Sequence, residues 1–338
     1  MSETIQLLTA TGVPESPARV DPPTRPPFRI GAVQHRWHPD PAEHAAALAE
    51  GVRMAAGEGA QLVCLQELTL SPYFAITADG PAAAGAVPEP LPGGPTHELA
   101  AALAAETGVP VHASLYERPG AGEVPEGAAG GLGFNTAIVV TPDGGLAART
   151  RKLHIPVTAG YYEDKYFLPG DGGYPVVALG DAHFGFPTCW DQWFPELARA
   201  YSLAGAEVLV YPTAIGSEPD HPGFDTQPLW QQVIVGNGIA NGTFMVAVNR
   251  IGDEALSPAL KGRSGPGLTF YGSSFISDPY GRVLIQAPRD EPAVLVADLD
   301  LDQRGDWLTL FPFLTTRRPD TYGPLLGGPA GGPGEPTV

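Results

Sequence analysis

The chain has very little cysteine and no long apolar run. Its 338 residues include two cysteines, Cys64 and Cys189, which can form at most one disulfide. A disulfide-rich secreted domain is therefore excluded, and we expect a reducing, cytoplasmic compartment. No apolar run approaches the roughly 18 residues of a membrane span, and the first residues lack the basic-then-apolar order of a secretory signal. We therefore expect neither a membrane protein nor a secreted one.

Basic residues are also scarce. The 19 Lys and Arg residues stand against 37 Asp and Glu residues, which gives a formal net charge of −18 and an isoelectric point near 4.7. Nucleic acids and anionic membrane surfaces both require clustered Lys and Arg. The composition therefore argues against nucleic acid or membrane as a partner.

Sequence motifs for metal and phosphate binding are missing as well. Among the eight histidines, the closest approach to a ligand spacing is His35-x-x-His38, and its place at the end of a strand pattern favours a structural or substrate-facing role. No G-x-x-x-x-G-K-[ST] sequence occurs, so nothing supports a nucleotide. We expect no metal and no cofactor.

Proline and glycine define the limits of the folded part. The 38 prolines and 43 glycines concentrate at the two ends and in one internal stretch. Residues 1–27 therefore read as a flexible N-terminal arm and residues 323–338 as a flexible C-terminal tail. Pro119–Gly133 reads as a mobile surface insertion, because strand patterns continue on both sides of it. Residues 28–322 are expected to form one large domain.

Within this domain, helix and strand patterns alternate. Strands are expected at 28–34, 61–68, 109–115, 207–214 and 243–252, with a hairpin across 134–153 and a late meander across 269–300. Helices are expected from 41 to Gly57 or Gly59, and at 96–107, 195–203 and 229–241. This order predicts an α/β domain in which helices cover the faces of a mixed sheet.

Cys189 is the residue that most strongly suggests chemistry. It lies between a strand pattern and a helix pattern in FGFPTCWDQWFPELARAYSLAGAEVLVYPT. Free backbone N–H groups at the start of a helix favour both a thiolate and an oxyanion. From this segment alone, a buried cysteine in a core turn is an equally good interpretation.

Two charged residues also stand at the ends of predicted strands. Glu67 follows the apolar run LVCLQ, and Lys152 closes the second strand of the hairpin in RTRKLHIP. The rim of a sheet is where α/β proteins build sites. Taken singly, Glu67 reads as a surface acid or helix cap, and Lys152 as a solvated basic edge. Cys64, on the opposite phase of the Glu67 strand, is expected to be buried packing.

These three segments resemble the nitrilase superfamily of carbon–nitrogen hydrolases. The first reads GAQLVCLQELTLSPYF, the second RKLHIPVTAGYYEDKYFLPGD and the third CWDQWFPELARAYSLAGAEVLVYPTAIGSEP, and the likeness extends from about Arg29 to Tyr322. The resemblance implies a four-layer α-β-β-α sandwich with two mixed β-sheets. CWDQWFPE, YPTAIGSEP and VNRIG look most like the N-carbamoylputrescine amidohydrolase branch, followed by the β-ureidopropionase branch.

The resemblance also implies roles for individual residues. Cys189 is the expected nucleophile, Glu67 the general base and then acid, and Lys152 the oxyanion stabiliser, helped by the backbone N–H of Trp190. Glu163 matches a second glutamate beside the site, although it could otherwise pair with a neighbouring lysine. The implied reaction is hydrolysis of a non-peptide C–N bond through a Cys thioester. An N-carbamoyl amine would yield amine, ammonia and carbon dioxide.

Substrate choice depends on the residues that face the other end of the small amide or ureido ligand. Carboxylates and aromatic faces bind an ammonium group, whereas Arg binds a carboxylate. Acidic and aromatic candidates outnumber Arg250 and Arg263, which favours an N-carbamoyl amine over β-ureidopropionate or another specialised amide. Taken singly, each candidate could be a locally satisfied surface residue. The expected substrate contacts are Tyr73, Tyr161, Asp191, Trp193, Glu196 and Thr213, with Trp190, Glu218 and Asp220 nearby.

Two further functions share these residues, and assembly is implied too. An acyltransferase would pass the thioester to a nucleophile other than water, and a non-catalytic relative would act through assembly or ligand binding. The second is disfavoured because all four acidic, basic and thiol positions are filled. The resemblance also implies a homodimer or a larger homo-oligomer. The apolar stripe of Leu197, Ala200, Tyr201 and Ala204 could support a dimer or simply pack on the sheet.

Overall fold

The protein is built around two large mixed β-sheets. The computed structural model describes residues 4–127, 130–254 and 268–327. The first sheet has the strand order β1-β15-β2-β3-β4-β5-β6, the second has the order β14-β13-β10-β9-β8-β7, and β11 pairs with β12. The strands are β1 Gln6–Ala10, β2 Phe28–Gln34, β3 Leu62–Cys64, β4 Val111–Glu117, β5 Phe134–Val140, β6 Leu146–Arg151, β7 Val177–Leu179, β8 Ala182–Gly185, β9 Val208–Pro212, β10 Phe244–Val248, β11 Ile251–Asp253, β12 Thr269–Tyr271, β13 Phe275–Ser277, β14 Val283–Gln286 and β15 Ala293–Leu299.

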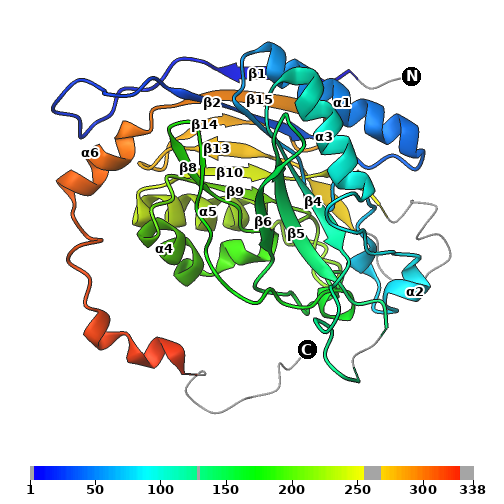
Figure 1. The fold of residues 1–338 in the computed structure, drawn as a ribbon. Coiled ribbons are helices and arrows are strands. Elements are labelled where there is room, and N and C mark those ends of the chain that lie inside the picture. The colour runs from blue at the N-terminus through cyan, green and yellow to red at the C-terminus, as the bar shows by residue number, and fades with distance from the viewer. Residues whose placement is uncertain (1–3, 128–129, 255–267, 328–338) are drawn as a thin grey trace.

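Helices cover the outer faces of both sheets. The α-helices are α1 Pro41–Gly57, α2 Pro81–Ala84, α3 Pro95–Thr107, α4 Pro195–Leu203, α5 Gln227–Asn241 and α6 Asp302–Leu310, and the short 3-10 turns are η1 Phe74–Ile76, η2 Glu163–Lys165, η3 Cys189–Trp193, η4 Pro319–Thr321 and η5 Gly323–Leu326. Figure 1 shows α1 and α3 over one sheet and α4 and α5 over the other. None of the described helices is long and apolar enough to cross a bilayer.

Apolar cores between the layers hold the sandwich together. Ile30 and Val139 of the first sheet pack against Val210 and Val246 of the second in the central core. A second core joins α1 and α3 to the first sheet, and a third joins α4 and α5 to the second sheet. The architecture is the α-β-β-α sandwich that the sequence resemblance implied. Burial of both faces of each sheet explains why its strands are almost continuously apolar.

The outer core accounts for the apolar stripe of α4. Leu197 and Tyr201 are both 1% exposed and pack with Trp230 and Ile234 of α5. Of the two interpretations of this stripe, ordinary packing therefore explains its two largest side chains. They contribute no free surface to a dimer.

Local sequence signals explain most helix boundaries. The Asp40 side chain accepts hydrogen bonds from Ala42 N and Glu43 N, and Pro41 occupies the first turn of α1, as the sequence predicts. Helix α4 has the bounds expected from the sequence. The strand expected at 61–68 is shorter, because β3 ends at Cys64 and Leu68 adopts a left-handed backbone conformation with φ of 48°. The chain turns at Glu67 instead of continuing the sheet.

Strand ends from both sheets meet at one edge. Glu67 follows β3, Lys152 follows β6, and Cys189 begins η3 shortly after β8. Pro187 lies beyond the end of β8, so its missing N–H removes no bond from the ladder. Cys64 lies in the central core between the sheets, as expected for a packing residue.

The N-terminal residues differ from the sequence expectation of a flexible arm. Strand β1 pairs in parallel with β15, and Arg25 forms ion pairs with Asp302 Oδ1 at 2.8 Å and Glu207 Oε1 at 2.9 Å. The proline-rich composition hid this strand, because its pairing partner is almost 300 residues away in sequence. At the other end, residues 323–326 form η5, and residues 328–338 of the expected tail lie outside the described residues.

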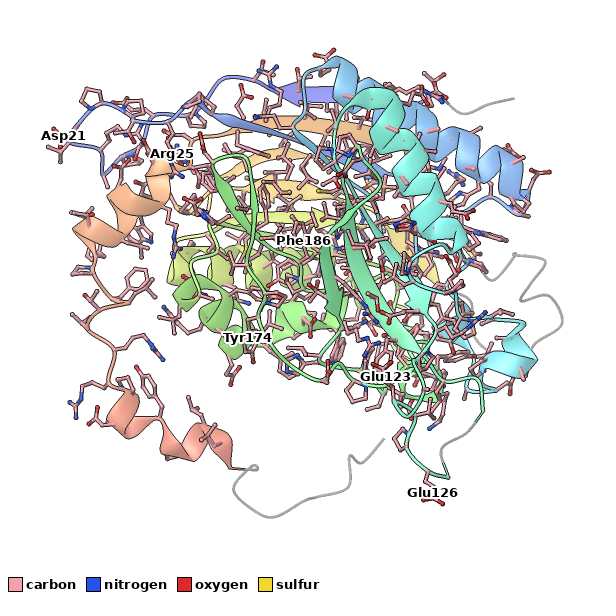
Figure 2. All side chains as sticks on the ribbon, viewed as in Figure 1. Asp21, Arg25, Glu123, Glu126, Tyr174 and Phe186 are labelled. Atoms are coloured by element: carbon pink, nitrogen blue, oxygen red, sulfur yellow. The ribbon has the colours of Figure 1, made fainter. Side chains whose placement is uncertain are left out.

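The insertion 119–133 is tied to the body through ion pairs. Arg151 donates to both Glu123 oxygens at 2.9 Å and also to the buried Glu117, which Arg149 contacts as well. Glu123 and Glu126 lie at the edge of the molecule, whereas Phe186 lies deep inside it (Figure 2). Residues 128 and 129 are outside the described part.

Candidate active site

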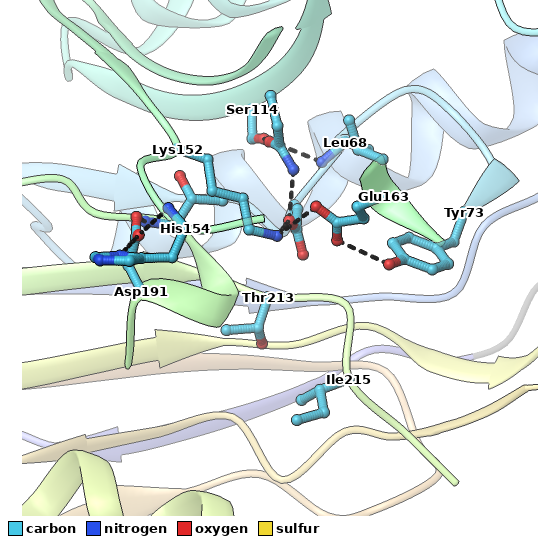
Figure 3. A network of polar contacts seen from close by, with 12 residues as sticks. Leu68, Tyr73, Ser114, Lys152, His154, Glu163, Asp191, Thr213 and Ile215 are labelled. Carbon is cyan, nitrogen blue, oxygen red and sulfur yellow. Dashed lines mark hydrogen bonds and ion pairs between the residues drawn. The ribbon is translucent and has the colours of Figure 1, made fainter. Parts of the chain in front are cut away.

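The four side chains expected to be catalytic lie together at the shared sheet edge. Lys152 Nζ donates to Glu67 Oε1 at 3.0 Å and to Glu163 Oε2 at 2.6 Å (Figure 3). All three side chains are at most 1% exposed, and Cys189 is 5% exposed. Glu163 therefore pairs with Lys152, while the neighbouring Lys165 pairs with Asp164.

The two glutamates have different partners. Glu163 has both oxygens engaged, because Tyr73 Oη donates to its Oε1 at 2.8 Å while Lys152 holds its Oε2. Glu67 Oε1 accepts two hydrogen bonds, from Lys152 and from Asn135 Nδ2 at 2.7 Å. Its Oε2 is buried, and no residue in the described ranges gives it a hydrogen-bond partner. Among the carboxylate oxygens of the two glutamates, Glu67 Oε2 is therefore the one without a hydrogen-bond donor in the described ranges.

Electrostatics hold this group in defined protonation states. Burial alone would lower the pKa of Lys152, but the charges of Glu163 and Glu67 outweigh it and raise that pKa above the ordinary range. Burial raises the pKa of the Cys189 thiol, and the charge of Glu67 adds to the effect, while Lys152 opposes it. Burial and the charge of Glu67 thus favour the protonated form of this thiol.

The turn that carries Cys189 is strained and tied to the segment that carries Lys152. Cys189 has φ of 36°, an unfavourable value for a residue with a side chain. The turn is fixed by Asp191, which accepts from Thr188 N at 3.1 Å and from His154 Nδ1 at 2.7 Å. This arrangement leaves Trp190 beside Cys189 in the first turn of η3. Asp191 joins the Cys189 and Lys152 segments, is 1% exposed and does not line the pocket described below.

A pocket of about 220 Å³ opens above Cys189. Its lining includes Cys189, Glu163, Pro156, Thr158, Tyr161, Trp190, Trp193, Ile215, Glu218, Thr226 and Leu229. The walls are thus mainly aromatic and aliphatic, and Glu218 is an acid additional to Glu163. A larger groove of about 740 Å³ lies between residues 18–25 and α6, and none of the four clustered side chains lines it.

The expected substrate contacts separate into two groups. Tyr161 and Trp193 line the pocket, and the Tyr161 hydroxyl accepts from Gly216 N at 2.9 Å. Tyr73 lies behind the pocket, where it holds Glu163. The remaining candidates do not line it: Thr213 is fully buried, and Glu196 and Asp220 are exposed on the surface.

Arg250 is a structural residue rather than a substrate-binding cation. It is fully buried, pairs with Glu254, and donates to the backbone carbonyls of Glu67 at 2.6 Å and Ser71 at 3.2 Å. The VNRIG segment thus fixes the loop that carries Glu67. Arg263, the other cationic candidate, lies outside the described residues.

Comparisons with known proteins agree with this geometry. Residues 29–308 match the family Carbon-nitrogen hydrolase. The chain belongs to the carbon–nitrogen hydrolase family. It is 38% identical to N-carbamoylputrescine amidase of Solanum lycopersicum over 88% of this chain and 94% of that one. It is 33% identical to citrullinase of Francisella tularensis over 88% of this chain and 98% of that one. Its fold matches a crystal structure of a carbon–nitrogen hydrolase from Helicobacter pylori G27 with a TM-score of 0.74 and 33% identity, covering 89% of this hydrolase and 99% of that chain.

The histidine pair His35 and His38 packs ring against ring at the end of β2. His35 and His38 lie with their ring centroids 5.0 Å apart, and His35 Nδ1 contacts the Arg36 carbonyl at 2.8 Å. Across the described part of the chain, no group of three or more His, Cys, Asp or Glu side chains is arranged to hold a metal ion.

Several residues of the site were not identified from the sequence. Asn135 bonds Glu67, and Ile215, Thr226 and Leu229 line the pocket. A signal existed for Asn135 only, since it is a polar residue near the start of the apolar strand FNTAIVV. The pocket residues lie on loops and at the start of α5, where no periodic pattern marks them.

Proposed function

We propose that this hydrolase removes the carbamoyl group from an N-carbamoyl amine whose other end carries a positive charge, as in N-carbamoylputrescine. The lining of the pocket above Cys189 carries this proposal: it combines aromatic walls with Glu218, and its described residues include no Lys or Arg. The tomato relative, an N-carbamoylputrescine amidase, supports the same substrate.

Glu218 is the residue suited to bind the distal ammonium group. It is half-buried, and its Oε1 accepts from Thr226 Oγ1 at 3.3 Å. Burial raises the pKa of Glu218, so an ammonium group beside it would stabilise its ionised form. The rings of Trp190 and Trp193 meet edge to face at 6.3 Å and offer aromatic surface to the same cation.

The first half of the reaction uses the unpartnered oxygen of Glu67. Glu67 Oε2 takes the proton of the Cys189 thiol, and the sulfur attacks the carbonyl carbon of the carbamoyl group. Lys152 Nζ and the backbone N–H of Trp190 hold the resulting oxyanion. Glu67 then gives its proton to the leaving nitrogen, so that ammonia departs and a carbamoyl thioester remains on Cys189.

In the second half, water resolves the thioester. Glu67 removes a proton from the water, whose oxygen attacks the thioester carbon, and the Cys189 thiol is released with that proton. The product is an N-substituted carbamic acid, which loses carbon dioxide without help from the protein. Glu163 keeps Lys152 charged and in place through the contact of its Oε2 with Nζ. Its Oε1 is held by Tyr73, so we assign Glu163 no proton transfer.

Other substrates fit the pocket less well. β-Ureidopropionate and related carbamoyl acids end in a carboxylate, which Arg binds best. Arg250 is occupied by backbone carbonyls and Glu254, so it is not available for this role. An amidase acting on another small amide, and an acyltransferase resolving the thioester with a different nucleophile, would use the same four side chains.

A substrate panel tests the proposal. Ammonia release is measured with N-carbamoylputrescine, its neutral analogue N-butylurea, β-ureidopropionate, citrulline and simple amides, with Cys189→Ala as the control. We expect the highest kcat/KM for N-carbamoylputrescine and none with the control. Higher kcat/KM for the carbamoyl acids would contradict the cation site. Transfer to hydroxylamine far above hydrolysis would favour the acyltransferase, and no turnover of any compound would favour a binding role.

We also propose that the hydrolase is a cytoplasmic homo-oligomer. From the end of α6 onward the chain leaves the body of the molecule (Figure 1), and Leu310, Phe311, Leu325 and Leu326 are 56%, 53%, 64% and 93% exposed. Apolar side chains gathered in one exposed segment commonly mark an interface. Light scattering at micromolar protein concentration should give more than one chain per particle. The Phe311→Ser variant should have fewer chains per particle. A monomer would contradict the proposal, and cell fractionation tests the compartment.

A further inference from the structure

Asn135 lies between the base and the lysine of the site. It is the second residue of β5 and is fully buried. Its backbone carbonyl accepts from Lys152 N at 2.8 Å, while its side-chain Nδ2 donates to Glu67 Oε1 at 2.7 Å. Asn135 thus contacts both catalytic segments of the first sheet without lining the substrate pocket.

Glu67 and Ser114 hold the two ends of the Asn135 amide. An ionised carboxylate only accepts hydrogen bonds, so the NH₂ group of Asn135 faces Glu67. Asn135 Oδ1 then faces the Ser114 hydroxyl 3.3 Å away, whose proton is free because Ser114 Oγ accepts from Leu68 N at 3.1 Å.

These bonds form a closed chain that begins and ends at neighbouring residues. Leu68 N donates to Ser114, Ser114 donates to Asn135, and Asn135 donates to the side chain of Glu67 (Figure 3 shows the Leu68 and Ser114 end). Leu68 has φ of 48°, so the turn that carries Glu67 is strained and depends on such contacts. The chain couples the backbone of this turn to the direction of the carboxylate.

Lys152 cannot perform this task alone. Its Nζ also donates to Glu163 at 2.6 Å, and in the proposed reaction it turns toward the oxyanion. When that happens, Asn135 is the donor that still holds Glu67 Oε1. The carboxylate then keeps its direction while Oε2, which has no partner among the described residues, exchanges the proton with Cys189.

We propose that Asn135, held by Ser114, is a positioning residue for Glu67: it fixes Oε1 so that Oε2 remains the atom that accepts and returns the proton. This inference rests on the proposed role of Glu67 as the base. Asn135 touches neither the substrate nor the sulfur, so it acts through Glu67 alone.

The test compares Asn135→Ala, Ser114→Ala and the double variant by kcat, KM and the pH profile of kcat/KM. For Asn135→Ala, kcat should fall about 10- to 100-fold, the range for loss of a hydrogen bond to a charged group. KM should change less than about threefold, because the pocket is intact. The acidic limb of the profile should move to higher pH, since the ionised carboxylate has lost a donor.

The Ser114 variants allow a conclusion even if Asn135→Ala does not fold. Ser114→Ala removes a single hydroxyl, so it should fold even if Asn135→Ala does not, and it should show the same changes at smaller size. The double variant should be no worse than Asn135→Ala, because both residues act along one chain of bonds. Additive losses without a shift of the pH profile would mean that the two residues only stabilise the fold, which would overturn the proposal.

Two controls separate this inference from the proposed function. Thr136→Val alters the next residue of β5, whose hydroxyl donates to Glu117 at 2.7 Å, and should leave the pH profile unchanged. Glu67→Gln should abolish turnover. Full activity of Glu67→Gln would defeat the proposed chemistry itself. An inactive Glu67→Gln beside an Asn135→Ala variant with wild-type kcat and pH profile would defeat only the role of Asn135.

Discussion

The floor and the wall of the pocket are built in different ways. What we call the floor is the almost fully buried group of Cys189 and Glu163, which line the pocket, with Lys152 and Glu67 behind them, and Lys152 pairs with both glutamates. The wall carries Glu218, Trp190, Trp193, Thr226 and Leu229, which are partly exposed and lie on loops and at helix starts.

Under the proposed function, this difference separates reaction from substrate choice. The floor would require fixed distances among charges, and its charged side chains are held by buried partners. The wall would meet only the remote part of the substrate, so its loops could change without moving the sulfur or the lysine. Changes in the floor should therefore affect every substrate alike, and changes in the wall should affect one class.

The largest expected effect comes from the floor. Lys152→Met should lower kcat on the order of 1,000-fold or more for charged and neutral substrates alike, because it removes the oxyanion donor and the cation between two buried glutamates. Lys165→Met is a matched control, since that lysine lies in the same segment, is 49% exposed and pairs with Asp164. Ammonia release measures both. A loss confined to one substrate class would contradict the separation.

The second largest effect is expected on substrate binding by the wall. Glu218→Gln should raise KM for N-carbamoylputrescine about 10- to 100-fold, since a charge-assisted contact is lost, and leave kcat/KM for N-butylurea within about threefold. Glu196→Gln, an exposed change on α4, is the matched control and should alter neither value. Equal losses for both substrates would show that Glu218 supports the floor instead of the wall.

The third expected effect concerns the free energy of unfolding and its dependence on two buried histidines. Burial lowers the pKa of His44 to about 4 and that of His112 to about 3, from an ordinary 6.5. Their contribution to stability is complete above about pH 6.5 and is lost as the pH falls toward these values, because the unfolded chain binds protons first. Each of these two histidines should therefore lower the free energy of unfolding by about 2 kcal/mol between pH 7 and pH 5.

His112→Phe sharpens this prediction. The His112 ring stacks on Phe186 at 5.3 Å, and neither of its nitrogens has a hydrogen-bond partner among the described residues. Phenylalanine should therefore fit in place of this ring. The variant should lose less unfolding free energy between pH 7 and pH 5 than the wild type, by the amount that His112 contributes, and urea unfolding at the two pH values measures the difference. An unchanged slope would show that this ring is not a buried neutral histidine.

The smallest effect is expected at an exposed ion pair near the wall. Arg289 contacts both oxygens of Asp225 at 2.8 and 2.9 Å, with both side chains about half exposed. Exposed pairs contribute about 0–1 kcal/mol. Arg289→Ala should change the unfolding free energy by less than about 1 kcal/mol and leave kcat unchanged. A larger loss would show that the wall is coupled to the core.

The residues of the floor could be predicted from the sequence because their segments resemble one family in the right order. The local patterns alone placed Glu67, Lys152 and Cys189 near strand ends and left their roles open. The structure brings all four side chains together. Their catalytic roles remain predictions for the variants above to test.

The wall and the network behind the floor could not be predicted so well. Asp191 and Arg250 looked like substrate-binding charges, but each is buried and bonded to segments distant in sequence, which no local pattern reveals. Strand β1 was missed for the same reason, since its partner β15 lies at the other end of the chain. Long-range pairing decides these positions, and a single sequence carries little trace of it.

Covalent capture of the intermediate tests the central claim most directly. The chain has two cysteines, and Cys64 is sealed in the central core. The hydrolase is quenched with acid during turnover of N-carbamoylputrescine, digested and mapped by mass spectrometry. The carbamoyl adduct should appear on Cys189 alone and be absent from Cys189→Ala. Turnover by Cys189→Ala, or an adduct on any other residue, would contradict the account.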